Sequence, residues 1–159
     1  IPSSLMQSMS AFVAQNVGAG KEERARKAMR TGMLLGVTIG IFVSALSFFR
    51  GDIPSALFTG NQAFIARSAE YLKGFAPEAI LTCLVFSYIG YFNGHGKTIP
   101  VMVQGISASF LVRVPLSYLF SIQKGATLTT IGYAVPLASV YGIIFFTICY
   151  LVFLKKMKK

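Results

Sequence analysis

Long apolar runs separated by short charged segments make up the chain. Residues 1–20, 31–49 and 125–154 carry no charged side chain, and residues 98–123 carry only Arg113. A helix needs about 20 mostly apolar residues to cross the hydrocarbon core of a bilayer. The pattern predicts an all-α, polytopic bundle of about five membrane helices, at residues 1–18, 31–49, 72–93, 98–121 and 132–154.

The composition agrees with a membrane protein. Of the 159 residues, 54% are apolar and 13% are charged, whereas a typical soluble domain has roughly 25% charged residues. The net charge of +10 lies in clusters between apolar runs, while a nucleic-acid-binding protein carries such charge on an exposed folded face. The pattern argues against a soluble enzyme and against nucleic acid as a partner.

Reactive and metal-binding side chains are few. Cys83 and Cys149 both fall inside apolar runs, which indicates free, buried thiols. One histidine and two distant cysteines do not make a set of zinc ligands, and no nucleophile–base arrangement is evident. We therefore expect no enzymatic activity, no bound metal and no cofactor.

The basic residues predict the orientation, because cytoplasmic loops are enriched in lysine and arginine. With residues 18–30 inside, the cytoplasmic set contains Lys21, Arg24, Arg26, Lys27, Arg30, Lys97, Lys155, Lys156, Lys158 and Lys159. The other side receives Arg50, Arg67, Lys73 and Lys124. This predicts a multi-pass protein of the inner or plasma membrane with its N-terminus outside and its C-terminus in the cytoplasm. The basic stretch after residue 20 could lie along the membrane surface. An N-terminus outside without a targeting signal leads us to expect a fragment that lacks preceding helices.

Small residues recur every four positions in two of the predicted spans. One helix face carries Gly32, Gly36, Gly40 and Ser44 in the second span, and another carries Ala134, Ala138 and Gly142 in the fifth. Small residues at this spacing allow two helix backbones to approach closely. Both faces therefore predict close helix packing.

Two connecting segments carry cap and turn signals. Asn61 precedes a short helical pattern that leads into the third span, and asparagine is a favoured N-cap residue. Residues 93–97 read Asn-Gly-His-Gly-Lys, which predicts a tight turn between two antiparallel spans. We expect His95, which lies between two glycines and beside Lys97, to be a solvated turn residue.

Glu78 is the acidic residue that falls inside a predicted span. A carboxylate in a bilayer is costly, so by default it faces a cavity or a partner. Such a group could bind and release a proton or hold a Na⁺ ion, and Thr82, one helical turn along, could add a hydroxyl ligand. Tyr88 lies nearer the middle of the span and could line a substrate pocket. The alternative is that the span starts later and that Glu78 lies in the headgroup layer.

Arg113 lies deep in the fourth predicted span. A guanidinium at this depth must pair with carbonyls or with a carboxylate, or extend to the interface. Pro115 lacks a backbone N–H and frees a carbonyl upstream, which Arg113 could cap. We therefore assign Arg113 a structural role.

Three segments resemble the signatures of one transporter family. Residues 12–25 contain the pattern QN-x-GAG-K…RA, residues 91–100 the pattern NG-x-GKT…P, and residues 111–116 the pattern LVR-x-P-L. In this order and spacing they are similar to the multidrug and toxic compound extrusion (MATE) family. The matching positions include Gln15, Asn16, Gly18, Gly20, Gly94, Gly96, Arg113 and Pro115.

The resemblance implies a fold and a function. Family members have twelve helices in two six-helix lobes, so this chain is expected to form helices eight to twelve, the second lobe without its first helix. Family members export organic cations and other amphipathic compounds in exchange for H⁺ or Na⁺, by alternating access to a central cavity. The implied partners are such small molecules, the lipid bilayer, the N-terminal lobe and helix seven.

The resemblance also bears on the coupling site. Several branches of the family carry an acidic pair in the second lobe, with one residue on helix seven and an aspartate on helix ten. The aspartate position falls on Thr82 in this chain, and Glu78 lies one helical turn away on the same face.

Two alternatives to cation-coupled drug export stay open. A lipid-linked sugar flippase of the related superfamily would need a strongly cationic cavity, and this chain offers only Arg113 inside a span. The second alternative is a truncated fragment that does not transport. A complete upstream lobe in the same reading frame would favour the transporter.

The charge bias generates a topology test in intact cells. Single cysteines that replace Lys27 or Lys158 are expected to resist an impermeant thiol reagent, because both positions are predicted to be cytoplasmic. A cysteine that replaces Gly60 is expected to react. The reverse labelling pattern would contradict the predicted orientation.

Overall fold

Helices make up almost all of the described chain. The computed structural model describes residues 2–53, 61–123 and 127–157. Its elements are α1 (Pro2–Gly18), α2 (Glu22–Phe49), α4 (Gln62–Phe75), α5 (Glu78–Gly94), α6 (Thr98–Ser107), the π-helix η1 (Ala108–Arg113), α7 (Val114–Ser121), α8 (Leu128–Gly132) and α9 (Ala134–Met157). No strand occurs in these ranges, which confirms the predicted all-α class. Gly60, Lys124, Lys158 and Lys159, which enter the orientation argument, lie outside the described residues.

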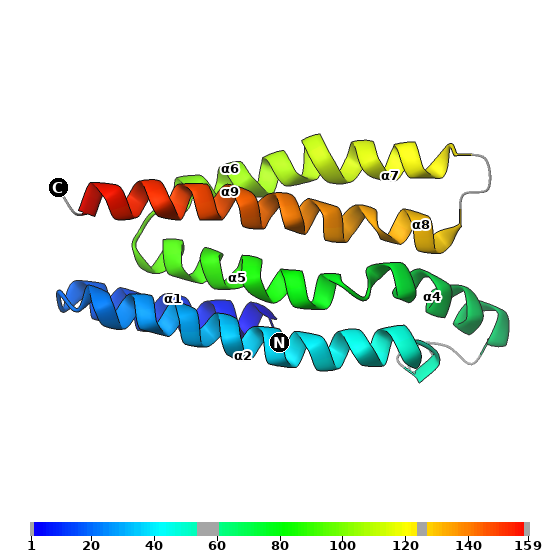
Figure 1. Ribbon diagram of the computed structural model, residues 1–159, viewed down its shortest axis with the longest axis horizontal. Helices are drawn as coiled ribbons and strands as arrows, with labels where there is room; N and C mark the ends of the chain where they lie inside the picture. Colours follow the sequence, from blue (N-terminus) through cyan, green and yellow to red (C-terminus); the bar gives the residue numbers. More distant parts are fainter. Residues whose placement is uncertain (1, 54–60, 124–126, 158–159) are drawn as a thin grey trace.

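Helix α5 lies in the middle of the bundle (Figure 1). It contacts α1 and α2 on one side, and α9 and α6 on the other. The turn between α1 and α2, the turn between α5 and α6, and the end of α9 lie at one end of the molecule (Figure 1). Helix α4, the end of α7 and the start of α8 lie at the opposite end. The two turns that the sequence analysis assigns to the cytoplasmic side therefore share one end.

Three helical segments are long and apolar enough to cross a membrane: Glu22–Phe49, Thr98–Ser121 and Leu128–Lys155. Helices α4 and α5 meet the same criterion as a pair that is bent by 53°. The described residues thus contain three candidate spans, or four with the bent pair, where the sequence pattern predicted five. Helix α1, at residues 2–18, has 17 residues and is not among them.

Two helix boundaries differ from the predicted ones for local reasons. Residues 22–30 are the first part of α2 and not a separate surface segment. Glu22 and Glu23 in the first turn favour a helix start there, because carboxylates interact favourably with the positive end of the helix dipole. The third predicted span is split before Glu78, because Pro77 lacks the N–H that a continuous helix requires.

The glycine face of α2 packs directly on α1 and α5, as the spacing predicted. A Cβ on Gly36 would lie 2.9 Å from the Cβ of Cys83, and one on Gly40 would lie 2.8 Å from the carbonyl oxygen of Ala79. A Cβ on Gly32 would collide with the Met9 side chain of α1. Close backbone approach is the main way in which membrane helices gain packing energy, because lipid removes the hydrophobic driving force between them.

The small-residue face of α9 makes the second close interface. Ala134 and Ala138 are buried, and a Cβ on Gly142 would lie 2.6 Å from Nε2 of Gln104 in α6. The Tyr141 hydroxyl donates a hydrogen bond of 3.0 Å to the Ser107 hydroxyl. These contacts confirm the predicted packing and hold α9 against α6.

The predicted cap at Asn61 is confirmed. Its side-chain oxygen accepts a hydrogen bond of 3.0 Å from the backbone N–H of Ala63, at the start of α4.

Gly40 offers a test of the packing between α2 and α5. Gly40→Ala is expected to lower the free energy of unfolding by about 1–3 kcal/mol, the usual range for overpacking. The added methyl group meets backbone atoms of Ala79 and Ile80, which cannot rotate away. The measurement is thermal unfolding of the purified protein in detergent. Gly105→Ala is the matched control, because a Cβ there meets nothing within 4 Å. Equal stability of the two variants would contradict the close approach.

Candidate functional site

Glu78 begins α5 and is buried. It follows Pro77, the residue that caps the helix, and only 6% of its surface is exposed. A carboxylate in the first turn lies beside backbone N–H groups that have no partner within the helix, so the local helix geometry favours its negative charge. The break between α4 and α5 therefore positions an acidic side chain inside the bundle.

The two oxygens of the Glu78 carboxylate have different surroundings. Oε1 accepts hydrogen bonds from the hydroxyl of Thr82, one turn along α5, and from the hydroxyl of Ser139 in α9, at 2.8 Å. Oε2 is buried and has no hydrogen-bond partner among the described residues. A buried polar atom without a partner is unfavourable, so Oε2 is the atom at which a proton or a cation would bind.

Glu78 lines a cavity of about 220 Å³ between α5, α6, η1 and α9. Its polar walls are formed by Glu78, Thr82, Gln104, Ser109, Arg113 and Ser139. Within the described residues, no three His, Cys, Asp or Glu side chains come together as metal ligands. A cation in this cavity would meet one carboxylate, neutral polar side chains and the guanidinium of Arg113.

The wall opposite α5 contains a π-helix. The backbone N–H of Val114 donates to the carbonyl of Ser109, five residues earlier. Pro115, in the first turn of α7, has no N–H to donate to Leu111, which favours this irregular turn. Because Ala108, Ser109 and Arg113 all line the cavity, the widened turn is part of the site.

Arg113 lies inside the fourth predicted span, within the Thr98–Ser121 candidate span. It lies at the end of η1, is exposed in this chain, and forms part of the cavity wall that also contains Glu78. No hydrogen bond joins its guanidinium to a backbone carbonyl among the described residues. Arg113 and Glu78 therefore place opposite charges on the wall of the same cavity, and the structural role of Arg113 stays a prediction.

Tyr88 does not line this cavity. Its ring stacks on Phe146 of α9 at a centroid distance of 5.8 Å, and its hydroxyl lies 3.1 Å from the Thr147 hydroxyl. The structure thus brings Glu78 and Thr82 together and places Tyr88 in the packing between α5 and α9. Ser139, the second hydroxyl donor to Oε1 of Glu78, was missed by the sequence analysis. Ser139 directly follows Ala138, a member of the small-residue face of α9. This neighbouring position was the available signal that Ser139 packs inside the bundle.

The signature glycines shape turns and close contacts. Gly20 and Gly96 have φ angles of 70° and 67°, the left-handed conformation that glycine adopts without strain, and each follows the end of a helix. Gly94 lets α5 approach α1, because a Cβ there would lie 2.6 Å from Val13. Gly18 has nothing near its Cβ position.

The polar pair of the first signature also serves the turn. The buried Asn16 side chain donates to the Phe12 carbonyl at 2.8 Å, and its backbone carbonyl accepts from Lys21 at 2.8 Å. Gln15 is exposed, and its carbonyl accepts from Ala19 at 3.1 Å. These residues form the chain reversal between α1 and α2.

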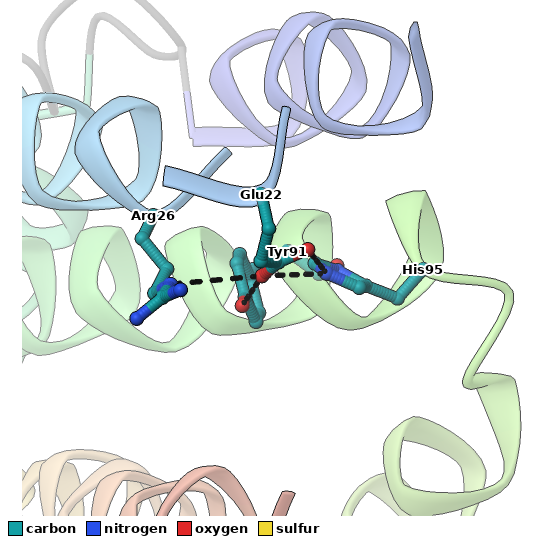
Figure 2. A network of polar contacts seen from close by, with 4 residues as sticks. All are labelled: Glu22, Arg26, Tyr91 and His95. Atoms are coloured by element: carbon teal, nitrogen blue, oxygen red, sulfur yellow. Dashed lines mark hydrogen bonds and ion pairs between the residues drawn. The ribbon is translucent and has the colours of Figure 1, made fainter. Parts of the chain in front are cut away.

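His95 is not the solvated turn residue that we expected. Its side chain is only 4% exposed, and Nε2 lies 3.0 Å from Oε2 of Glu22 (Figure 2). The α5–α6 turn folds against the start of α2, so the histidine is covered. The partner is 73 residues away in the sequence, so the local pattern carried no signal of the contact.

Comparison with known proteins places the chain in a family. The MatE family matches residues 1–119. The chain belongs to the MATE family. It is 31% identical over 109 residues to the multidrug resistance protein PmpM of Pseudomonas aeruginosa, which covers 69% of this chain. It is 27% identical over 125 residues to protein DETOXIFICATION 14 of Arabidopsis thaliana, in a match that covers 76% of this chain. It is 26% identical over 146 residues to the multidrug resistance protein MdtK of Klebsiella pneumoniae, in a match that covers 89% of this chain.

This MATE chain is shorter than those relatives. It spans 23% of PmpM, 25% of DETOXIFICATION 14 and 31% of MdtK. No solved structure matches it significantly. The family and the apolar helices together make it a multi-pass membrane protein.

Ser139 tests the geometry of the site in this MATE protein. Ser139→Ala removes a donor to Glu78 and is expected to lower the free energy of unfolding in detergent by about 1–2 kcal/mol. The loss is expected to shrink in a Glu78→Gln background, because the two side chains then no longer share a charge-assisted hydrogen bond. Ser109→Ala is the matched control from the same cavity wall. Additive effects of Ser139→Ala and Glu78→Gln would contradict the contact.

Proposed function

We propose that this chain forms part of a secondary active transporter that exports organic cations in exchange for H⁺ or Na⁺, with Glu78 as the coupling carboxylate. The observation that carries the proposal is the buried Glu78, which lines a cavity between helices. One of its oxygens is hydrogen-bonded, and the other has no partner among the described residues. The multidrug resistance proteins PmpM and MdtK among its relatives support efflux as the overall activity.

A single carboxylate suits exchange between two cations. An ionised carboxylate is costly to bury without a partner, so it favours an occupant that neutralises it. A proton can bind Oε2 directly. A Na⁺ ion requires oxygen ligands, which the carboxylate and the hydroxyl and amide oxygens of Thr82, Ser139 and Gln104 supply at the cavity wall. A cationic substrate competes for the same charge, so binding of the ion displaces the substrate.

The position of the cavity supports a membrane-embedded site over a headgroup position. Ser139 lies in the interior of the Leu128–Lys155 candidate span, and Ser109 lies near the middle of the Thr98–Ser121 span. Both residues line the cavity with Glu78. In repeat-built transporters, substrate and ion sites lie near the midplane and are formed by interrupted helices. The bend before Glu78 and the π-helix are such interruptions.

The charge of the cavity favours cation export over a lipid-linked sugar flippase. A pyrophosphate-linked sugar would require several cationic side chains, whereas this wall combines Arg113 with the acidic Glu78. Arg113 supplies a positive charge that helps to expel a bound cation. We also propose that the protein works by alternating access, together with an N-terminal lobe and a seventh helix. In this arrangement the α1–α2 turn and the α5–α6 turn face the cytoplasm.

Glu78→Gln is expected to abolish ion-coupled efflux in the full-length protein and to leave expression and membrane insertion intact. The amide keeps the size of the side chain but carries no negative charge that a bound ion could neutralise. Glu78→Asp is expected to retain part of the activity, because it keeps the charge and shortens the reach. The measurement is efflux of a fluorescent cation in inverted vesicles, with H⁺ and Na⁺ gradients imposed separately.

Glu70→Gln is the control, because Glu70 lies in the adjacent α4 and outside the cavity wall. Its efflux is expected to match that of the wild type. Wild-type rates in the Glu78→Gln variant would move the coupling site elsewhere in the full-length protein. If efflux in the Glu78→Gln variant still responded normally to the H⁺ and Na⁺ gradients, the coupling site would likewise have to lie elsewhere in the full-length protein.

A further inference from the structure

A second cluster of titratable side chains lies at the end of the bundle where the α1–α2 and α5–α6 turns meet (Figure 1). It contains Glu22 and Arg26 of α2, Tyr91 of α5, and His95 directly after α5 (Figure 2). None of these residues lines the cavity that contains Glu78. We infer that His95 and Glu22 form a proton-binding site that holds the start of α2 against the end of α5.

Both ring nitrogens of His95 face hydrogen-bond acceptors. Nδ1 lies 2.9 Å from the backbone carbonyl oxygen of Tyr91. Nε2 lies 3.0 Å and 3.2 Å from the two carboxylate oxygens of Glu22. A carbonyl oxygen can only accept, so Nδ1 carries a hydrogen in this arrangement.

The contact between Nε2 and Glu22 then requires one more proton. A neutral ring with hydrogen on Nδ1 has a lone pair on Nε2, which would face the lone pairs of an ionised carboxylate. A proton between the two groups removes this repulsion and forms a hydrogen bond. The site is therefore complete when the ring is an imidazolium beside a carboxylate.

The surrounding groups favour that distribution of charge. Tyr91 donates its hydroxyl to Oε1 of Glu22 at 2.8 Å, and Nε of Arg26 lies 3.8 Å from the same oxygen, so both stabilise the carboxylate. From α9, the group that faces the imidazole is the ring of Phe153, at a centroid distance of 5.1 Å. It carries no charge, and it covers the ring from water.

Proton loss would weaken the connection between the two helices. Histidine ordinarily changes charge between roughly pH 5 and 8, and this side chain is 4% exposed. Without the proton, the half-buried carboxylate of Glu22 faces a lone pair and the hydrogen bond between the two side chains is lost. Protonation of the His95–Glu22 site therefore stabilises the junction between α2 and α5, independently of any ion bound at Glu78.

The test is the pH dependence of unfolding in the full-length protein in detergent. Wild-type protein is expected to unfold a few degrees above His95→Gln at about pH 6, and the difference is expected to vanish at about pH 8.5. The sign follows from the site: the protonated ring makes both hydrogen bonds, and deprotonation removes one. Glu22→Gln is expected to flatten the pH dependence in the same way, whereas Glu23→Gln, an exposed neighbour on the same turn, is expected to leave it unchanged.

A second measurement observes the histidine ring directly in the wild-type protein. Nitrogen NMR of histidine-labelled protein is expected to show a ring with hydrogen on both nitrogens at about pH 6 that loses one hydrogen as the pH rises. Assignment follows from the loss of the signal in His95→Gln, or from its shift in Glu22→Gln if the first variant does not fold. A ring that stays neutral at about pH 6, or a stability difference that is independent of pH, would overturn the proposal.

Discussion

Close backbone contact around α5 is the constraint on which the rest of the structure depends. Gly36 and Gly40 of α2 face α5, and Gly90 and Gly94 of α5 face α1. A Cβ on Gly90 would lie 2.8 Å from the Met6 carbonyl oxygen, and one on Gly40 would lie equally close to the Ala79 carbonyl oxygen. Apolar side chains in a bilayer gain little by leaving lipid, so these contacts, and not hydrophobic burial, determine which helices pack together.

The position of α5 determines where its polar ends lie. Glu78 begins the helix and His95 follows its last residue, so the two groups are separated by roughly 25 Å at 1.5 Å per residue. Glycine contacts hold one side of the helix. On the other side, Phe92 stacks on Phe146 of α9 at a centroid distance of 5.6 Å. Neither end of α5 can shift without displacing a helix that packs against it.

The sequence predicted the features that are periodic or local. The four-residue spacing of Gly32, Gly36 and Gly40 identified a packing face, and Asn61 identified a helix start, because each signal lies within one helix. Glu78 was recognisable because an acidic residue in an apolar run is rare. The contact of Glu78 with Thr82 was also within reach, because the two residues are one turn apart.

Pairings between distant residues could not be predicted in the same way. Ser139 and Glu78 are 61 residues apart, and His95 and Glu22 are 73 apart. Each pairing depends on which helices become neighbours and on their rotation, which no local pattern contains. His95 illustrates the result: its glycine neighbours indicated an exposed turn, whereas the fold of the whole bundle buried it.

The two polar clusters differ in how they connect helices, and this difference bears on how the bundle could move. Glu22 and His95 join α2 to α5, two helices that glycine contacts already hold together. Glu78 and Ser139 join α5 to α9, and the adjacent wall includes the π-helix before Pro115. A π-turn and a proline leave fewer regular backbone hydrogen bonds to resist a change of shape. Under the proposed function, occupancy of Glu78 therefore acts on the more deformable side of α5, while the proton at His95 stiffens the side that is already closely packed.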